Sequence, residues 1–206
     1  MKNLLSSLQQ KGTIMSENIE NKKEQFNEMM SRFIKKMDKT KFVRTPNYNY
    51  DHNTESGLFA RWGKTVEDDP LYSPIGPEIL DLEISTICNG IDNVPCKHCY
   101  KSNTGSGENM SFETFKIIFD KMPTLTQIAF GIGDIDSHPE LFKIFEYCKT
   151  NSVAPNMTTN GWGMTKEIAE KLSNLCGAIA VSRYDNKDVC YNAVKILTDE
   201  GMTQIN

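Results

Sequence analysis

The stretch that decides the fold runs from Asp81 to Tyr100 and reads DLEISTICNGIDNVPCKHCY. It continues a run in which apolar and polar residues alternate, and this period of two predicts a half-buried strand over 79–85. The apolar members of the run are Leu80, Leu82 and Ile84. The strand leads into a loop that holds half of the six cysteines of the chain within twelve positions. These cysteines are Cys88, Cys96 and Cys99.

Three thiols in one loop have three alternative uses. They hold an iron–sulfur cluster, for which short cysteine spacings are typical. Alternatively, Cys96-x2-Cys99 is half of a structural zinc site with His98 or Cys88 nearby, although no second ligand pair follows at a matching spacing. A disulfide framework suits short secreted chains, and this chain shows no secretory signal. Three ligands leave one metal position open, which is typical of a catalytic centre.

Composition narrows the class of protein. The chain has 206 residues, is 38% hydrophobic and carries a formal net charge of −4. The length predicts one main domain plus an extension. The acidic balance argues against nucleic acid as a partner, and no apolar run reaches the length of a membrane span. The N-terminus is too short and polar for a signal peptide, so we expect a cytoplasmic protein with reduced cysteines.

Residues 1–77 are expected to form an extension of helix and loop, and residues 78–206 the main domain. A helix is predicted over 16–39 because apolar residues recur there at spacings of three and four. They are Phe26, Met29, Met30, Phe33, Ile34 and Met37. This helix either packs on its own domain or docks a partner. The segment 41–77 is rich in Asn, Asp, Tyr, Gly and Pro and is expected to be loop-like, with Arg61 at the surface.

From residue 79 onward, strands and helices are predicted to alternate. The expected strands are 79–85, 127–130, 156–158, 178–181 and the beginning of a fifth at 202–205. The expected helices are 111–122, 139–150, 165–177 and 186–200, with Ser111 and Thr165 as N-caps. Four such alternations predict a parallel sheet with right-handed crossovers. In these folds the active site lies at the carboxyl ends of the strands.

Polar segments follow the first four of these strands. They are the cysteine loop, GIGD at 131–134, TTNG at 158–161 and SRYD at 182–185. Because the strands are parallel, the four segments are expected to meet at one end of the sheet. Gly131 and Gly133 would let backbone approach a ligand closely. The alternative is that these loops are polar simply because loops lie in water.

The loop Ile-Cys-Asn-(x)6-Cys-Lys-His-Cys-Tyr-Lys resembles the cluster loop of the radical S-adenosylmethionine (radical SAM) superfamily, where the usual spacing is Cys-x3-Cys-x2-Cys. This chain has seven residues between Cys88 and Cys96, and we interpret the difference as a loop insertion because Gly90 and Pro95 favour a turn. The resemblance implies that Cys88, Cys96 and Cys99 hold three irons of a [4Fe-4S] cluster, whose fourth iron binds S-adenosylmethionine (SAM).

The resemblance also implies a set of SAM contacts. The segment 130–141 is similar to the superfamily's Gly-Gly-Glu-Pro segment, with Asp134 in place of the Glu that binds the amino group of SAM. The segment 158–161 resembles the Thr-Asn-Gly that ends the third strand. Ser182 resembles the serine that ends the fourth, and Arg183 beside it suits a carboxylate. The implied contacts are Gly131, Gly133, Asp134, Thr159, Asn160, Ser182 and Arg183.

This resemblance covers about residues 78–206 and implies an α/β fold. The expected architecture is a partial TIM-like (β/α) barrel of parallel strands with four to five βα units. The implied activity is reductive cleavage of SAM to a 5′-deoxyadenosyl radical, which abstracts hydrogen from an unknown substrate. An electron donor such as flavodoxin or ferredoxin would be a partner.

Asn206, the last residue, falls within the predicted fifth strand, so the barrel is expected to be incomplete. A sheet that stops there exposes an edge, which proteins normally cover or pair. We therefore expect a C-terminally truncated product, half of a split enzyme or a chain whose barrel a second chain completes. Two further alternatives stay open: a non-catalytic fragment that keeps the fold, and a zinc-stabilised interaction module.

Overall fold

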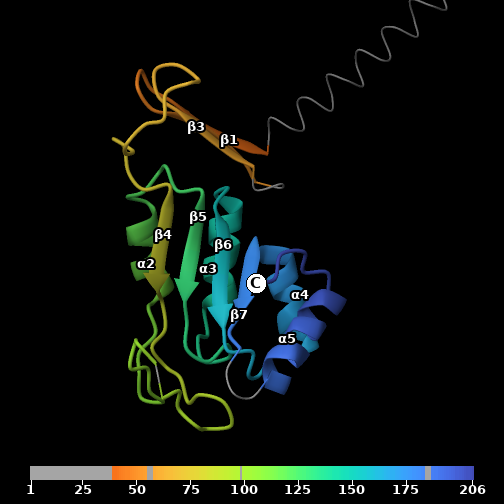
Figure 1. Cartoon of the computed structure of the whole chain (residues 1–206). Coiled ribbons are helices and arrows are strands. Elements are labelled where there is room, and N and C mark those ends of the chain that lie inside the picture. Colours follow the sequence, from red (N-terminus) through yellow and green to blue (C-terminus); the bar gives the residue numbers. More distant parts are fainter. Residues whose placement is uncertain (1–38, 55–57, 98, 184–186) are drawn as a thin grey trace, which may run out of the picture. The chain divides into compact units, whose positions relative to one another are not determined.

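The computed structural model describes residues 39–206 except 55–57, 98 and 184–186. Lys41–Asn206 forms one compact unit that contains two sheets (Figure 1). The helix predicted over 16–39 lies outside the described residues, apart from its last position. The division into 1–77 and 78–206 stays a prediction.

The larger sheet is parallel and has the strand order β4-β5-β6-β7. Its strands are β4 (Ile79–Glu83), β5 (Gln127–Gly131), β6 (Ala154–Thr159) and β7 (Ala178–Val181). The helices that follow them are α2 (Phe112–Phe119), α3 (Leu141–Thr150), α4 (Lys166–Leu175) and α5 (Lys187–Asp199). The predicted alternation of strands and helices is therefore confirmed. The result is a mixed α/β fold that is compatible with a partial βα barrel.

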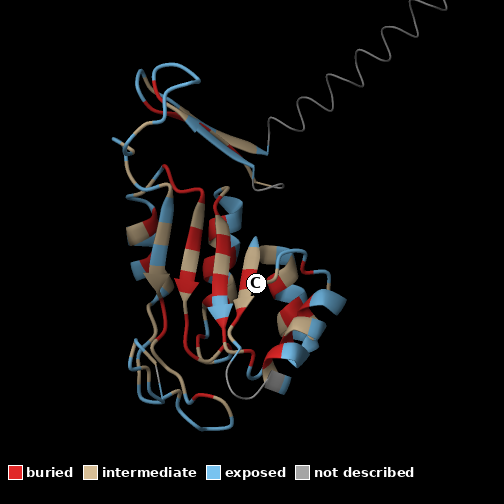
Figure 2. Cartoon of the chain, viewed as in Figure 1, coloured by how far each residue is buried: buried red, intermediate tan, exposed pale blue. Residues whose placement is uncertain are grey.

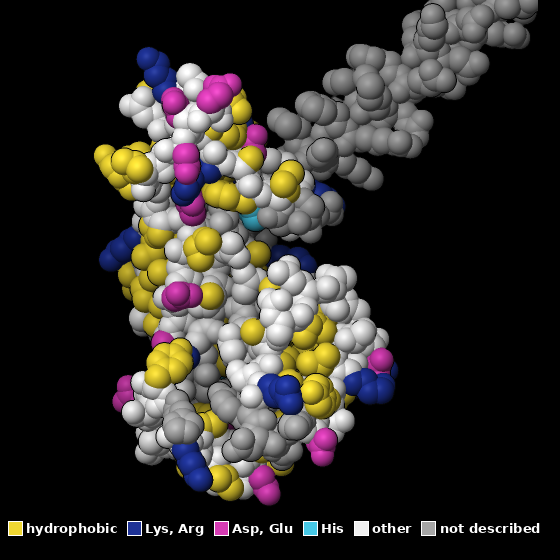
Figure 3. All heavy atoms as spheres, in the orientation of Figure 1, with side chains coloured by type: hydrophobic (Ala, Val, Ile, Leu, Met, Phe, Trp, Pro, Cys, Tyr) yellow, Lys and Arg dark blue, Asp and Glu magenta, His cyan; other side chains and the backbone are white. Residues whose placement is uncertain are grey.

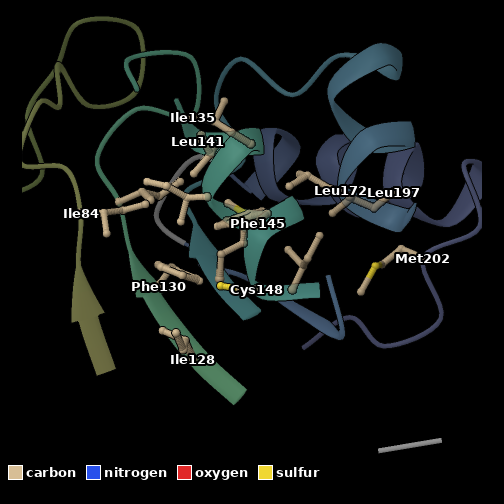
Figure 4. Packing of buried hydrophobic residues seen from close by; sticks show 14 of the residues in the cluster. Ile84, Ile128, Phe130, Ile135, Leu141, Phe145, Cys148, Leu172, Leu197 and Met202 are labelled. Carbon is tan, nitrogen blue, oxygen red and sulfur yellow. The ribbon is translucent and has the colours of Figure 1, made fainter. Parts of the chain in front are cut away.

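The core lies between this sheet and its helices. Buried and part-exposed residues alternate along β5, as Figure 2 shows, so that Ile128 and Phe130 face the helices. The ring centroids of Phe130 and Phe145 lie 5.0 Å apart, and Cys148 is buried beside them (Figure 4). Removing apolar surface from water at roughly 25 cal/mol per Å² holds the helices on one face of the sheet. The other face carries shorter or more polar side chains, such as Asn156.

Side-chain caps set the starts of two helices. The Oγ of Ser111 accepts a hydrogen bond from the amide of Thr114 at 3.2 Å, which confirms the predicted cap of α2. Thr165 caps α4 in the same way. The helix predicted from residue 139 begins instead at Leu141. The Glu140 side chain before it accepts from the amide of Phe112 at 2.9 Å, so it caps the neighbouring helix α2.

The chain end pairs with the edge of the parallel sheet. The amide of Asn206 donates to the carbonyl of Ile179, and the amide of Val181 donates to the carbonyl of Asn206, both at 2.9 Å. Ile205 lies opposite Ile179 in a parallel bridge. The predicted fifth strand therefore begins here, as an extension of the sheet beyond β7.

The smaller sheet corrects the expectation of a loop over 41–77. Its three strands, in the order β1-β2-β3, are β1 (Thr40–Arg44), β2 (Asn49–Asn53) and β3 (Phe59–Trp62). Tyr48, Tyr50 and His52 recur at every second position, which is a period-two signal in the sequence. All three side chains are buried in the structure. The hydroxyl of Tyr50 donates to the carbonyl of Thr124 at 2.7 Å, which joins this sheet to the segment before β5. Arg61 pairs with Asp69 and Glu78, at 3.2 and 3.4 Å.

The described surface is of mixed charge. On the face shown in Figure 3, Lys and Arg side chains are interspersed with Asp and Glu side chains. Within the described part of the chain, no helix has both the length and the hydropathy that a membrane crossing requires.

Candidate functional site

The carboxyl ends of the four parallel strands meet at one pocket of about 200 Å³. The strand arrows in Figure 1 point toward the cysteine loop that forms one wall of it. The residues that line the pocket are Cys88, Cys96, Cys99, Tyr100, Lys101, Asn103, Ile132, Gly133, Thr158, Thr159, Asn160 and Ser182. The structure thus brings together the three cysteines and a residue from each of the other three polar segments.

The cysteine loop is anchored where it leaves β4. The amide of Cys88 donates to the carbonyl of Thr104, and the amide of Thr86 donates to the carbonyl of Glu108, both at 2.9 Å. The loop therefore returns beside its own beginning. These backbone hydrogen bonds join the segment that contains Cys88 to the segment 104–108, so the fold itself fixes the position of Cys88.

The residues inserted between Cys88 and Cys96 form a tight turn. The amide of Val94 donates to the carbonyl of Ile91 at 2.9 Å, and Asp92 and Asn93 between them have φ of 52° and 59°. Two central residues with positive φ are typical of a type I′ turn, and Asp and Asn tolerate that conformation. The insertion therefore folds back on itself, so Cys88 and Cys96 still line the same pocket.

The three loop thiols are partly buried and form no disulfide. Burial raises the pKa of the Cys88 thiol to about 11, and the Asp134 carboxylate and Cys96 add to the rise. A metal that binds Cys88 must therefore displace its proton. Among the described residues, no three His, Cys, Asp or Glu side chains are grouped as ligands of one metal ion. Cys148, by contrast, is part of the hydrophobic core, where burial raises its pKa to about 12.

The two glycines at the end of β5, Gly131 and Gly133, have different neighbours. A Cβ on Gly133 would lie 2.5 Å from the carbonyl carbon of Ile87, closer still to its oxygen, and 3.0 Å from the Cβ of Cys88. Gly133 therefore packs against the backbone of the cysteine loop. A Cβ on Gly131 would lie 2.5 Å from the Nζ of Lys101, so this glycine leaves space for a charged pair. Only Gly133 of the two is among the described residues that line the pocket.

Asp134 faces the cysteine loop instead of the pocket. Its Oδ2 accepts hydrogen bonds from the backbone amide of Asn89 at 2.8 Å and from the Asn89 Nδ2 at 2.9 Å. Its Oδ1 is buried without a hydrogen-bond partner. Asp134 is not among the described residues that line the pocket.

The polar residues after β6 and β7 divide between the pocket and the surface. The Oγ1 of Thr159 accepts from the amide of Gly161 at 3.1 Å, and the Oδ1 of Asn160 accepts from the amide of Trp162 at 2.8 Å. These bonds stabilise the turn while both residues line the pocket. Ser182 lines it as well. Arg183 is exposed, and its guanidinium lies over the ring of Tyr191, 5.8 Å from the centroid.

Three further residues at the site were not selected from the sequence. Lys101 lines the pocket and forms an ion pair with Glu83 of β4, and the two side chains are 20% and 32% exposed. Asn103 also lines the pocket, and its Oδ1 is buried without a hydrogen-bond partner. A signal was available for Glu83, because it alternates with Leu82 and Ile84 and so must leave the core face of β4.

Comparison with known proteins gives relatives but no family assignment. No protein-family model matches the chain. Over 124 residues it is 32% identical to a protein of Pyrococcus furiosus, the tungsten-containing aldehyde ferredoxin oxidoreductase cofactor-modifying protein. The match covers 58% of this chain and 33% of that protein. The chain therefore spans about a third of the length of this curated relative.

Solved structures share the fold. Streptococcus suis SuiB superposes with a TM-score of 0.57 and 12% identity, over 82% of this chain and 54% of that one. SuiB bound to S-adenosylmethionine superposes with a TM-score of 0.55 and 12% identity, over 82% and 55% of the two chains. At this identity the match shows a common fold.

Proposed function

We propose that this chain provides the cluster- and SAM-binding part of a radical SAM enzyme. The observation that carries the proposal is the pocket at the carboxyl ends of the parallel strands. Three cysteines of one loop line it together with Gly133 and Ser182, which come from two other strand ends. Parallel α/β folds bind their ligands at this end of the sheet. SuiB, which shares the fold, has been crystallised with SAM bound.

The donor set is one that an iron–sulfur cluster uses. Three thiols of one loop line one pocket. In a cubane cluster each cysteine binds a different iron. Cys88, Cys96 and Cys99 would hold three irons, and the fourth would remain open for SAM. When bound, the cluster would supply the electron that cleaves SAM to a 5′-deoxyadenosyl radical.

The residues of the pocket would orient SAM in this scheme. Gly133 brings backbone close to the thiols, and a side chain there would collide with the cysteine loop. Thr159, Asn160 and Ser182 also line the pocket, and their hydroxyl and amide groups suit a ribose or a carboxylate. Lys101 adds a cation to the lining, although Glu83 balances its charge. Arg183 lies outside the lining and would need to move to reach SAM.

The rest of the proposed enzyme follows from its chemistry. A donor such as flavodoxin or ferredoxin would reduce the cluster, and a second chain or a longer product would complete the barrel. A role in modifying the cofactor of another protein is a second candidate, which the name of the Pyrococcus furiosus relative favours. The alternatives are a fragment that binds the cluster without cleaving SAM, half of a split enzyme, and a zinc-stabilised interaction module.

Anaerobic reconstitution with iron and sulfide tests the proposal. We expect the wild-type chain to take up a [4Fe-4S] cluster and, with dithionite and SAM, to form 5′-deoxyadenosine. The variant with Cys88, Cys96 and Cys99 all replaced by Ala should lose both properties. The matched control is Cys176→Ala, which removes a thiol at the end of α4, outside the pocket lining.

Each other outcome points elsewhere. A cluster without cleavage would favour the fragment or the split enzyme, and a partner chain that restores cleavage would decide between them. Zinc uptake in place of iron would contradict the proposal and favour the interaction module.

A further inference from the structure

The carboxylate of Asp134, which follows β5, accepts hydrogen bonds from Asn89, the residue after Cys88. Asp134 Oδ2 accepts two hydrogen bonds from Asn89, at 2.8 Å from the backbone amide and 2.9 Å from the side-chain Nδ2. Hydrogen bonds to a carboxylate are shorter and stronger than those between neutral groups. A bidentate donor also fixes the direction of the acceptor, so the two bonds set the orientation of Asn89 and of the peptide that joins it to Cys88.

The segment after β5 also forms a hydrogen bond with Ile87, the residue before Cys88. The amide of Asp134 donates to the carbonyl of Ile87 at 2.8 Å, and the hydroxyl of Ser137, which lies 3.3 Å from the same oxygen, donates to the carbonyl of Asp134 at 2.7 Å. Gly133 packs on this carbonyl, which leaves no room for a side chain. Cys88 therefore lies between two neighbours that are both tied to the segment after β5.

The sequence resemblance does not imply these contacts. A ligand of the SAM amino group has to present a carboxylate oxygen to the pocket. Asn89 occupies Oδ2 of Asp134, so only Oδ1, which is buried without a hydrogen-bond partner, is left for that role. Asp is also one methylene shorter than the Glu of the resembling segment.

We infer that Asp134 is a positioning residue that acts through Asn89 to hold the Cys88 thiol at the pocket. This inference rests on the proposed function for its purpose, whereas the contacts that carry it lie within the chain itself. The backbone amide of Asn89 donates its hydrogen bond to Asp134. This bond fixes the peptide next to Cys88, so that Cys88 lines the same pocket as Cys96 and Cys99.

Amide hydrogen exchange of the metal-free chain tests the inference without a cluster. In Asp134→Ala the amide of Asn89 should exchange at least about tenfold faster than in wild type, because its hydrogen bond is lost. The control is Asp136→Ala, which removes an exposed carboxylate two positions along the same loop and should leave this rate unchanged. An unchanged rate in Asp134→Ala would overturn the inference.

A donor–acceptor exchange separates positioning from ligand binding. Asn89→Asp places two carboxylates against each other and should speed amide exchange at position 89. After reconstitution, it should also speed loss of iron to a chelator by about tenfold. Combining it with Asp134→Asn places the side-chain amide at position 134 and the carboxylate at position 89. The rate of hydrogen exchange at the backbone amide of residue 89 and the rate of iron loss should then return to within about threefold of wild type.

The same variants also test whether Asp134 binds SAM instead. If Asp134 binds the SAM amino group, Asp134→Asn alone and the double variant would both weaken SAM binding while iron retention stays at the wild-type level. That result would overturn the positioning role. Absence of a cluster in the wild-type chain would contradict the proposed function instead, and the exchange rates of the metal-free variants would still decide the inference.

Discussion

Gly133→Ala is the substitution whose cost follows most directly from the site. The added methyl would lie 2.5 Å from the carbonyl carbon of Ile87 and 3.0 Å from the Cβ of Cys88. Both neighbours belong to the cysteine loop, and the nearest of them is backbone, which cannot rotate away. The loop must therefore separate from the segment after β5.

The cost of this separation has two parts. Overpacking in a dense contact costs roughly 1–3 kcal/mol, and loss of the 2.8 Å hydrogen bond from the amide of Asp134 to Ile87 costs about 1 kcal/mol. We expect Gly133→Ala to lower the free energy of unfolding by about 2–4 kcal/mol. We also expect faster loss of iron to a chelator, because Cys88 moves with Ile87.

Urea unfolding and iron retention of the reconstituted chain measure these effects. The control is Gly201→Ala, because φ at Gly201 is +86° and an added Cβ meets nothing within 4 Å. Only backbone strain should appear there, at about 1 kcal/mol, with normal iron retention. The reasoning fails if Gly133→Ala unfolds within 0.5 kcal/mol of wild type, roughly the scatter of a surface substitution, and keeps its iron.

Three further predictions concern a cap and two titrating groups. Ser111→Ala removes the hydrogen bond to the amide of Thr114 and should lower the free energy of unfolding by about 1 kcal/mol in urea. Burial, and then the charge of Lys41, lower the pKa of His52 below 6.5, so the folded state binds protons less readily than the unfolded state. Stability should fall as the pH drops below 6.5, and His52→Phe should flatten that fall. The Cys88 pKa of about 11 against an ordinary 9.0 predicts about 100-fold slower alkylation at pH 8 than for a free thiol, measured on the metal-free chain; equal rates would contradict the burial of Cys88.

The parallel sheet was predictable because its signals are local. Alternating residues mark each strand, and caps such as Ser111 and Thr165 depend on hydrogen bonds three residues away. The cysteine pocket was predictable for a related reason. Once strands run parallel, their carboxyl ends share one edge, and the segments after them meet there.

The smaller sheet was missed because its strands contain residues that disfavour strands. Asp51 and Asn53 alternate with the buried residues of β2, and Asn49 at its start is itself buried; Asn and Asp are depleted in strands. The buried face itself carries a histidine, His52, and not an aliphatic residue. Burial against the segment before β5 overrides these propensities.

The contacts of the charged residues were not predictable because their partners are distant in sequence. Asp134 and Asn89 are 45 positions apart, and their contact depends on how the cysteine loop returns. The pairing of Glu83 with Lys101 likewise depends on the path of the cysteine loop between them. A sequence pattern indicates which chemistry is present, whereas the register of a long loop decides which groups touch.

The central claim is that three thiols bind a cluster with one iron left open for SAM. Electron paramagnetic resonance of the reconstituted, dithionite-reduced chain, recorded with and without SAM, tests it most directly. The account predicts a [4Fe-4S]⁺ signal whose g values change when SAM is added, and no such signal when Cys88, Cys96 and Cys99 are replaced by Ala. A cluster signal that SAM leaves unchanged would contradict the open iron, and a cluster that survives the loss of all three cysteines would contradict the site.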